Sequence, residues 1–246
     1  MQLTKKEFKQ DLSKKIDWNE LLIYFSASYL ISNRISPDFS YYFIKKGTKP
    51  NRITLYMIIS GILGGLFFMF PFLWAKIVGA ILIQLWFILD CSDGEVARYT
   101  KTFSKFGSEL DFLAHMIDHP FFCISFALSL IQLNLYPAWL VLATVFGCLF
   151  LDSTMRNLIT LEKFTDEPSE KTFHAPTRMT LKNWLKTIFN TFLFFPNVIL
   201  FGVLVYFIDF AFGTPFFLIL LLGNFVTSLI IILLKLKRKL NQYYFN

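Results

Sequence analysis

The sequence predicts an all-α integral membrane protein with six transmembrane helices and an N-terminal interfacial amphipathic helix. Hydrophobic residues make up 55% of the 246-residue chain, aromatic residues make up 19%, and the mean hydropathy is +0.52. These values are far above those of a soluble domain of this length. A soluble helical bundle would also need polar faces at a period of 3.6 residues, and the last two apolar runs lack them.

Six apolar runs are each close to the roughly 20 residues that a helix needs to cross a bilayer. They cover residues 53–72, 75–92, 108–131, 137–157, 189–210 and 214–234. Pro50 disfavours helical backbone at Lys49, so the first span is expected to start there. We expect a cytoplasmic N-terminal arm with the interfacial helix over 1–52, a six-helix membrane domain over 53–235 and a basic cytoplasmic tail over 236–246.

Residues 18–35 are expected to form the interfacial helix. This run is apolar but short, and Ser and Asn residues interrupt it. Basic residues on both sides favour a helix that lies along the cytoplasmic interface over the alternative, a seventh span. Residues 1–20 are charged and lack the apolar core of a cleavable signal peptide.

The net charge of +7 is distributed as in a multi-pass membrane protein. Ten of the 24 basic residues lie between Lys5 and Arg52, whereas the alternate loops hold only Lys76. By the positive-inside rule, both termini and the loop between the second and third spans are expected in the cytoplasm. The basic excess would then contact lipid headgroups, and we expect no nucleic-acid partner. Small size and the absence of extra domains favour a bacterial inner membrane.

Three aspartates, Asp90, Asp93 and Asp111, stand at the ends of the second and third apolar runs. Carboxylates at the edge of a span are costly and usually functional, and cation binding is their first candidate role. Helical residues three and four apart share a face. One face therefore carries Asp90, Asp93, Gly94 and Ala97, and another carries Gly107, Asp111, His115 and Asp118.

If the short basic loop between these spans turns the chain back, the two acidic faces meet around one or two cations. Oxygen ligands of this kind suit Mg²⁺, Mn²⁺ or Ca²⁺. Each aspartate alone could cap a helix or pair with Arg98 or Lys101. The whole set, with its glycines and Arg98, favours a site for divalent metal and phosphate, and therefore an enzyme.

The run from Asp90 to His115 resembles the signature of the CDP-alcohol phosphotransferase family, D-x2-D-G-x2-A-R-x8-G-x3-D-x3-D, and matches all but its final position. The preceding P-N-R-I-T-L of residues 50–55 resembles the start of that family's first span. The resemblance implies six transmembrane helices, usually in a homodimer, around a cytoplasm-facing cavity with two divalent cations, Mg²⁺ or Mn²⁺. It also implies that an alcohol attacks the β-phosphorus of a CDP-linked donor and displaces CMP.

The resemblance assigns roles to individual residues. The implied metal ligands are Asp90, Asp93 and Asp111, with Asp111 also in the catalytic group. The residues that would leave room for the cytidine and its phosphates are Gly94, Ala97 and Gly107. Arg98 would be a phosphate or ion-pair partner. Asn51 and Thr54 resemble positions near the nucleotide, and helix capping is their alternative role.

His115 is where the sequence departs from the family pattern, which has a fourth aspartate there as base or metal ligand. Histidine suits both roles, because its ordinary pKa is near 6.5 and its imidazole binds Mn²⁺ better than Mg²⁺. We expect His115 to be the general base and a metal ligand. Two alternatives remain: Asp118 supplies the missing carboxylate, or the change has damaged or repurposed the site.

The acceptor site has weaker signals. Asp152 and Arg156 are four residues apart near the end of the fourth run, which permits either a structural ion pair or an Arg156 that binds acceptor phosphate. Asp118 is a further acceptor candidate. Less specific candidates in the following loop are His174, Arg178 and Lys182.

We therefore expect a membrane transferase of phospholipid biosynthesis, with CDP-diacylglycerol as donor and a small polar alcohol as acceptor. The reverse arrangement transfers a CDP-linked headgroup to a lipid alcohol. A non-catalytic protein that kept the metal and nucleotide cavity is a further alternative. A metal-ion carrier is disfavoured, because it would need polar residues near the midplane of several spans, and the last two runs are almost wholly apolar.

Overall fold

The computed structural model describes residues 4–165 and 179–245, and within these ranges the regular structure is helical. The N-terminal elements are α1 (Lys5–Lys15), α2 (Trp18–Tyr24), the π-helical turn η1 (Ser28–Ser32) and α3 (Asn33–Lys45). The remaining elements are α4 (Pro50–Met69), α5 (Leu73–Thr100), α6 (Gly107–Gln132), α7 (Ala138–Thr165), α8 (Leu181–Leu193), α9 (Phe195–Phe212) and α10 (Phe216–Phe245). The acceptor candidates His174 and Arg178 lie outside the described residues.

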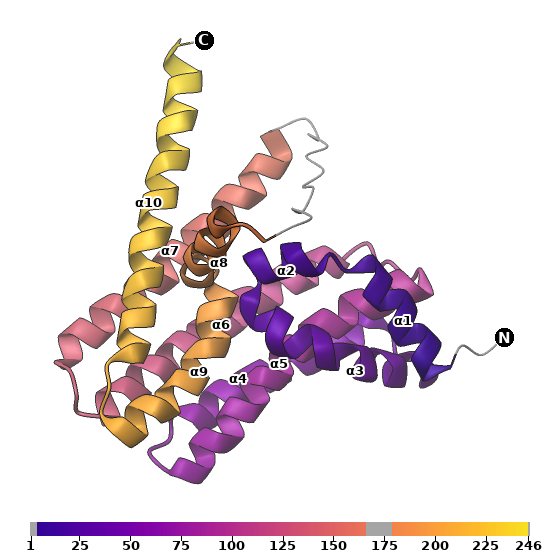
Figure 1. Ribbon diagram of the computed structural model, residues 1–246, viewed down its shortest axis with the longest axis horizontal. Helices are drawn as coiled ribbons and strands as arrows, with labels where there is room; N and C mark the ends of the chain where they lie inside the picture. Colours follow the sequence, from indigo (N-terminus) through magenta and orange to yellow (C-terminus); the bar gives the residue numbers. More distant parts are fainter. Residues whose placement is uncertain (1–3, 166–178, 246) are drawn as a thin grey trace.

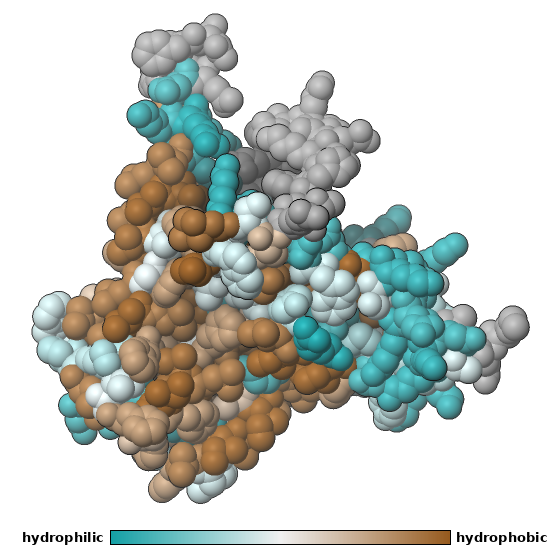
Figure 2. Space-filling model, viewed as in Figure 1, coloured by the Kyte–Doolittle hydropathy of each residue, from teal (hydrophilic) through white to brown (hydrophobic). Residues whose placement is uncertain are grey.

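Six of the described helices, α4, α5, α6, α7, α9 and α10, are long and apolar enough to cross a membrane. Their order and number confirm the predicted all-α membrane fold. They form one bundle, and α1, α2 and α3 form an N-terminal arm that packs against its side (Figure 1). Hydrophobic residues cover the visible face of the bundle, and hydrophilic residues gather on the arm and on the far end of α10 (Figure 2).

The fifth span is shorter than its predicted run of 189–210. It begins at Phe195, because α8 ends at Leu193, Phe194 caps both helices with extended backbone, and Pro196 lies in the first turn of α9. Proline is tolerated at that position but breaks a helix that continues through it. Residues 189–193 therefore belong to α8, a separate helix that the apolar pattern did not distinguish from the span.

The predicted single helix over 18–35 is wrong, because the structure divides this run into α2, η1 and the start of α3. The carbonyls of Ile23 and Tyr24 accept hydrogen bonds from the side-chain amides of Asn190 and Asn197, at 3.0 and 3.1 Å. The amide of Ala27 donates to Asn197 Oδ1 at 3.3 Å. Tertiary bonds from α8 and α9 thus replace the backbone bonds that would continue α2.

The N-terminal arm is bound to the helix that carries the first acidic motif. Phe8 of α1 is 1% exposed and packs edge-on against Tyr99 of α5, with ring centroids 5.0 Å apart. Lys5 and Lys9 pair with Asp38 of α3 at 2.6 and 2.7 Å. These two ammonium groups hold the pKa of Asp38 below its ordinary value. The arm therefore braces the end of α5.

Helices α4 and α5 approach closely through glycine. A Cβ atom added at Gly79 would lie 2.5 Å from the amide nitrogen of Phe68 and 2.8 Å from the carbonyl oxygen of Gly64. Nearby, the buried ammonium of Lys76 bonds the Phe68 carbonyl of α4 and the Ser129 hydroxyl of α6, each at 3.0 Å. Together these contacts hold the first half of α5 against α4 and α6.

Substituting Gly79→Ala should destabilise the bundle by about 1–3 kcal/mol, because the backbone atoms opposite Gly79 cannot turn away from a methyl group. The measurement is the midpoint of thermal unfolding in detergent. Ile81→Ala is the matched control, since Ile81 is on the same helix and 62% exposed. An unfolding midpoint for Gly79→Ala equal to that of the control would contradict this account of the packing.

Candidate active site

The acidic faces of α5 and α6 meet as their spacing predicts. Helix α5 ends at Thr100, Lys101 adopts a left-handed conformation with φ of 54°, and α6 begins at Gly107, so the short loop returns the chain beside itself. Ligand atoms of Asp90, Asp111 and His115 all lie within 4.8 Å of one another. We call these three residues the cation cluster.

His115 lies between the two carboxylates of the cation cluster. Its Nε2 atom is 3.5 Å from Asp90 Oδ1 and 3.6 Å from Asp111 Oδ1. Two carboxylates held this close repel each other unless a positive charge lies between them. The set of two carboxylates and one imidazole suits a divalent cation, and the imidazole favours Mn²⁺ over Mg²⁺. The residues present therefore fit the expected metal.

Asp93 is not among the three clustered ligands, but it lines a cavity together with Asp111. Its Oδ2 accepts a 2.6 Å hydrogen bond from the hydroxyl of Thr54 on α4. Thr54 also donates to the Pro50 carbonyl, while Lys49 is the cap of this helix. The alternative of helix capping by Asn51 or Thr54 is therefore wrong.

A cavity of about 370 Å³ lies between α4, α5 and the loop that follows α5, and we call it the loop cavity. It gathers all the expected nucleotide-side residues except Arg98. Those that line it are Asn51, Thr54, Asp93, Gly94, Ala97, Gly107 and Asp111. Asn51 also reaches the loop, where its side-chain amide donates to the Ser104 hydroxyl at 3.1 Å.

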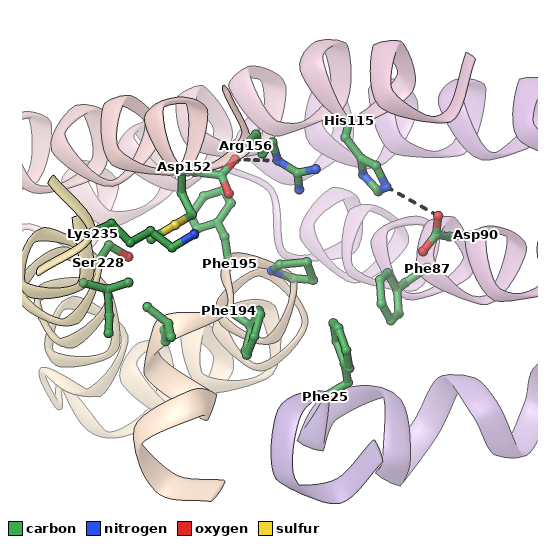
Figure 3. A pocket seen from close by; sticks show the side chains of 14 residues that line it. Phe25, Phe87, Asp90, His115, Asp152, Arg156, Phe194, Phe195, Ser228 and Lys235 are labelled. Carbon is green, nitrogen blue, oxygen red and sulfur yellow. Dashed lines mark hydrogen bonds and ion pairs between the residues drawn. The ribbon is translucent and has the colours of Figure 1, made fainter. Parts of the chain in front are cut away.

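A second cavity of about 470 Å³, the aromatic cavity, is lined by the other two residues of the cation cluster. Its polar wall contains Asp90 and His115 of the cluster, and Figure 3 shows His115 and Asp90 turned toward each other there. The aromatic residues that line it are Phe25, Phe87, Phe194 and Phe195. The cation cluster thus contributes Asp90 and His115 to one cavity and Asp111 to the other.

Arg156 lines the aromatic cavity and is also held by an ion pair. Its Nε atom donates to Asp152 Oδ2 at 3.1 Å, as the spacing of four residues predicts. Arg156 therefore forms the predicted ion pair and also lines the cavity, so the two alternatives do not exclude each other. Lys235 of α10 lines the same cavity, so two cationic side chains approach it.

His119 is a polar residue of this region that the sequence analysis missed. It is 1% exposed, and its Nδ1 lies 2.7 Å from Asp152 Oδ2. The signal that could have found it is the repeat of Asp111, His115 and His119 at intervals of four residues, which places all three on one face of α6.

Three expected site residues lie elsewhere. The guanidinium of Arg98 rests beside Gly94 but lines a separate small cavity under α1, with Glu95. Asp118 is fully buried, accepts a 2.8 Å hydrogen bond from the Trp86 indole and packs against Gly61, so it lines neither the loop cavity nor the aromatic cavity. Lys182 is exposed on α8.

Comparisons with known proteins agree with this arrangement. The family model for CDP-alcohol phosphatidyltransferase matches residues 47–213, from the start of α4 to the end of α9. A bifunctional IPC transferase and DIPP synthase of Aquifex aeolicus (strain VF5) is 36% identical over 121 residues, which are 49% of this chain and 25% of that protein. The chain thus matches about a quarter of the length of this relative. Because the family model covers more than half of the chain, this protein belongs to the CDP-alcohol phosphatidyltransferase family.

Proposed function

We propose that the protein transfers a substituted phosphoryl group from a CDP-linked donor to an alcohol and releases CMP, in phospholipid biosynthesis. Family membership supports the reaction class. The observation that carries the proposal is that the cation cluster contributes residues to the walls of both the loop cavity and the aromatic cavity. A transfer reaction needs two substrates on opposite sides of one reacting phosphorus, and this arrangement supplies a cavity for each.

The loop cavity is the proposed donor site. Its small residues Gly94, Ala97 and Gly107 leave space for the cytidine and its phosphates, and Asn51 and Thr54 offer polar groups. The residues that would hold the divalent cations are Asp90, Asp93 and Asp111. A bound divalent cation would neutralise the pyrophosphate and stabilise the charge on departing CMP. Arg98 is proposed to approach the phosphates from beside Gly94.

In the proposed reaction, the acceptor hydroxyl oxygen attacks the β-phosphorus of the donor. A new phosphorus–oxygen bond forms, and the bond from this phosphorus to the bridging oxygen breaks. CMP leaves with that oxygen, and the hydroxyl proton passes to Nε2 of His115. This atom faces Asp90 at the wall of the aromatic cavity, which supports its role as base for an alcohol bound there. Metal ligation by His115 would use the same lone pair and would replace the role of base.

The acceptor is proposed to bind in the aromatic cavity, with an anionic group near Arg156 and Lys235. Two cationic side chains in a largely apolar cavity favour an anion, because their charges are weakly screened there. A small polar alcohol with such a group is the first candidate, and CDP-diacylglycerol is the corresponding donor. The wall of Phe25, Phe87 and Phe194 favours a second candidate, in which a CDP-linked headgroup is transferred to a lipid alcohol.

We also propose that the termini and both cavities face the cytoplasm of a bacterial inner membrane. The basic loops at the same end of the spans support this orientation. A homodimer is proposed on the family resemblance alone. CMP release by purified protein, measured with labelled CDP-diacylglycerol, Mg²⁺ or Mn²⁺ and a panel of alcohols, tests the reaction and identifies the acceptor. A second series uses a CDP-linked headgroup as donor and a lipid alcohol as acceptor, and absence of CMP release in both series would reject the proposed reaction.

Substituting His115→Ala should lower turnover by about 10²–10⁴-fold, because the acceptor hydroxyl loses its proton acceptor. Asp118→Asn is the matched comparison on the same helix, because an asparagine oxygen can still accept from the Trp86 indole, and most of its turnover should remain. The metal concentration for half-maximal turnover of His115→Ala should stay near that of the wild type. A large rise in that metal concentration would identify His115 as a metal ligand. Loss of turnover in Asp118→Asn but not in His115→Ala would reject His115 as the general base.

Substituting Thr54→Val should raise the Mg²⁺ concentration needed for half-maximal turnover by about ten- to a hundredfold, because Asp93 loses a charge-assisted hydrogen bond that orients its carboxylate. Thr54→Ser should remain close to the wild type. The matched control is Thr144→Val, since the Thr144 hydroxyl is also buried but bonds the Leu140 carbonyl of its own helix. Equal metal dependence in Thr54→Val and wild type would show that the Thr54 hydrogen bond does not orient Asp93 for metal binding.

A further inference from the structure

Three polar side chains from α6 and α7 form a closed cluster beside the aromatic cavity. Oδ2 of Asp152 lies 2.7 Å from Nδ1 of His119 and accepts from Nε of Arg156 at 3.1 Å. Nη2 of Arg156 lies 3.4 and 3.3 Å from the two ring nitrogens of His119. Each member of this cluster therefore contacts both of the others.

One side of the cluster is buried in the protein, and the other side faces the aromatic cavity. The side chains of His119, Asp152 and Arg156 are 2%, 12% and 21% exposed, respectively. Asp152 and Arg156 line the aromatic cavity, whereas His119 lies behind them. Figure 3 shows Arg156 between Asp152 and His115 on the wall of this cavity. The most accessible member is therefore the cation.

His119 is held in one orientation by aromatic neighbours. Its ring centroid lies 5.1 Å from that of Phe195, 5.9 Å from that of Trp86 and 5.3 Å from that of His115. An Nδ1–H group directed at Asp152 then fixes the carboxylate, and the carboxylate fixes the guanidinium through Nε. His119 thus connects the proposed base His115 with the cation Arg156 through direct contacts.

We propose that His119 and Asp152 are positioning residues that hold the guanidinium of Arg156 where it binds the anionic group of the acceptor alcohol. The identity of this ligand rests on the proposed function. A long arginine side chain loses rotational freedom when it binds an anion. The contacts with Asp152 and His119 already restrict the Arg156 side chain in the folded protein, so less entropy is lost when the anion binds. They also keep the distance between the anion site and His115 constant. The acceptor hydroxyl and its anionic group are thereby held in one reactive geometry.

Asp152 and Arg156 are four residues apart on one helix, so they could pair without a third residue. A purely structural cluster would change the unfolding midpoint and the kinetic constants for both substrates. A positioning cluster changes the binding of the anion selectively. These different consequences separate the two roles.

The test compares inorganic phosphate binding in wild type, Arg156→Gln, His119→Leu and His119→Asn by isothermal titration calorimetry in detergent. The difference in phosphate affinity between wild type and Arg156→Gln measures the contribution of Arg156. His119→Leu should lower this Arg156-dependent affinity on the order of tenfold, because Asp152 and Arg156 lose the hydrogen bond that holds them. His119→Asn should restore most of it, because an asparagine amide can donate from nearly the position of Nδ1.

Thr154→Ala is the matched control on α7, since the exposed Thr154 hydroxyl bonds the Phe150 carbonyl of its own helix. It should bind phosphate as the wild type does. Unchanged phosphate affinity in His119→Leu, failure of His119→Asn to restore it, or no Arg156-dependent binding in the wild type would each overturn the inference.

A parallel assay of CMP release separates this inference from the proposed function. His119→Leu should raise the KM for the acceptor about tenfold while the KM for the CDP-linked donor stays within about twofold. If the wild type releases CMP but His119→Leu binds phosphate as the wild type does, the proposed reaction is supported and the positioning role is rejected. Arg156-dependent phosphate binding that follows the predicted order, without CMP release from any pair of substrates, would reject the reaction and leave the positioning role standing.

Discussion

The meeting of Asp90, Asp111 and His115 is the interaction on which the rest of the structure depends. Two carboxylates and an imidazole within 4.8 Å of one another, at the edge of membrane spans, are unfavourable unless the surrounding fold holds them together. The close approach of α4 and α5 at Gly79 and the Lys76 bridge to α4 and α6 fix α5 between its neighbours. The hydrogen bond from the Trp86 indole to Asp118 also joins α5 to α6, closer to the cation cluster.

The cation cluster also explains why two different cavities lie at one end of the bundle. The loop cavity is bounded by small and polar residues, and the aromatic cavity by rings and two cationic side chains. Because the cluster contributes to both walls, a group bound in either cavity lies next to it. The proposed transfer follows from this arrangement: a nucleotide on one side, an alcohol on the other, and the reacting phosphorus between them.

Much of the fold could be predicted because membrane spans and the motif depend on local pattern. The six apolar runs correspond to the six long helices, and residues at intervals of three and four brought Asp90, Asp111 and His115 together. The break after Tyr24 depends on Asn190 and Asn197, more than 160 residues away, and no local pattern reports such contacts.

Two further features of the site also depended on tertiary contacts. Asp118 looked available because it shares a helical face with His115, but Gly61 and Trp86 enclose it. In the sequence, His119 is one more polar residue in a span. The positioning role proposed for it depends on its contact with Asp152 of α7. In both cases the neighbouring helix, and not the residue's own helix, determines what the side chain can do.

The proposed function requires the cation cluster to lie between a nucleotide cavity and an acceptor cavity. The most direct test is a crystal structure of the protein with Mn²⁺ and CMP, with the metal located by its anomalous scattering. We expect an anomalous peak bound by Asp90 and Asp111, with the cytidine beside Asn51 and Thr54 in the loop cavity. A peak remote from these carboxylates, or CMP beside Arg156 in the aromatic cavity, would contradict this arrangement.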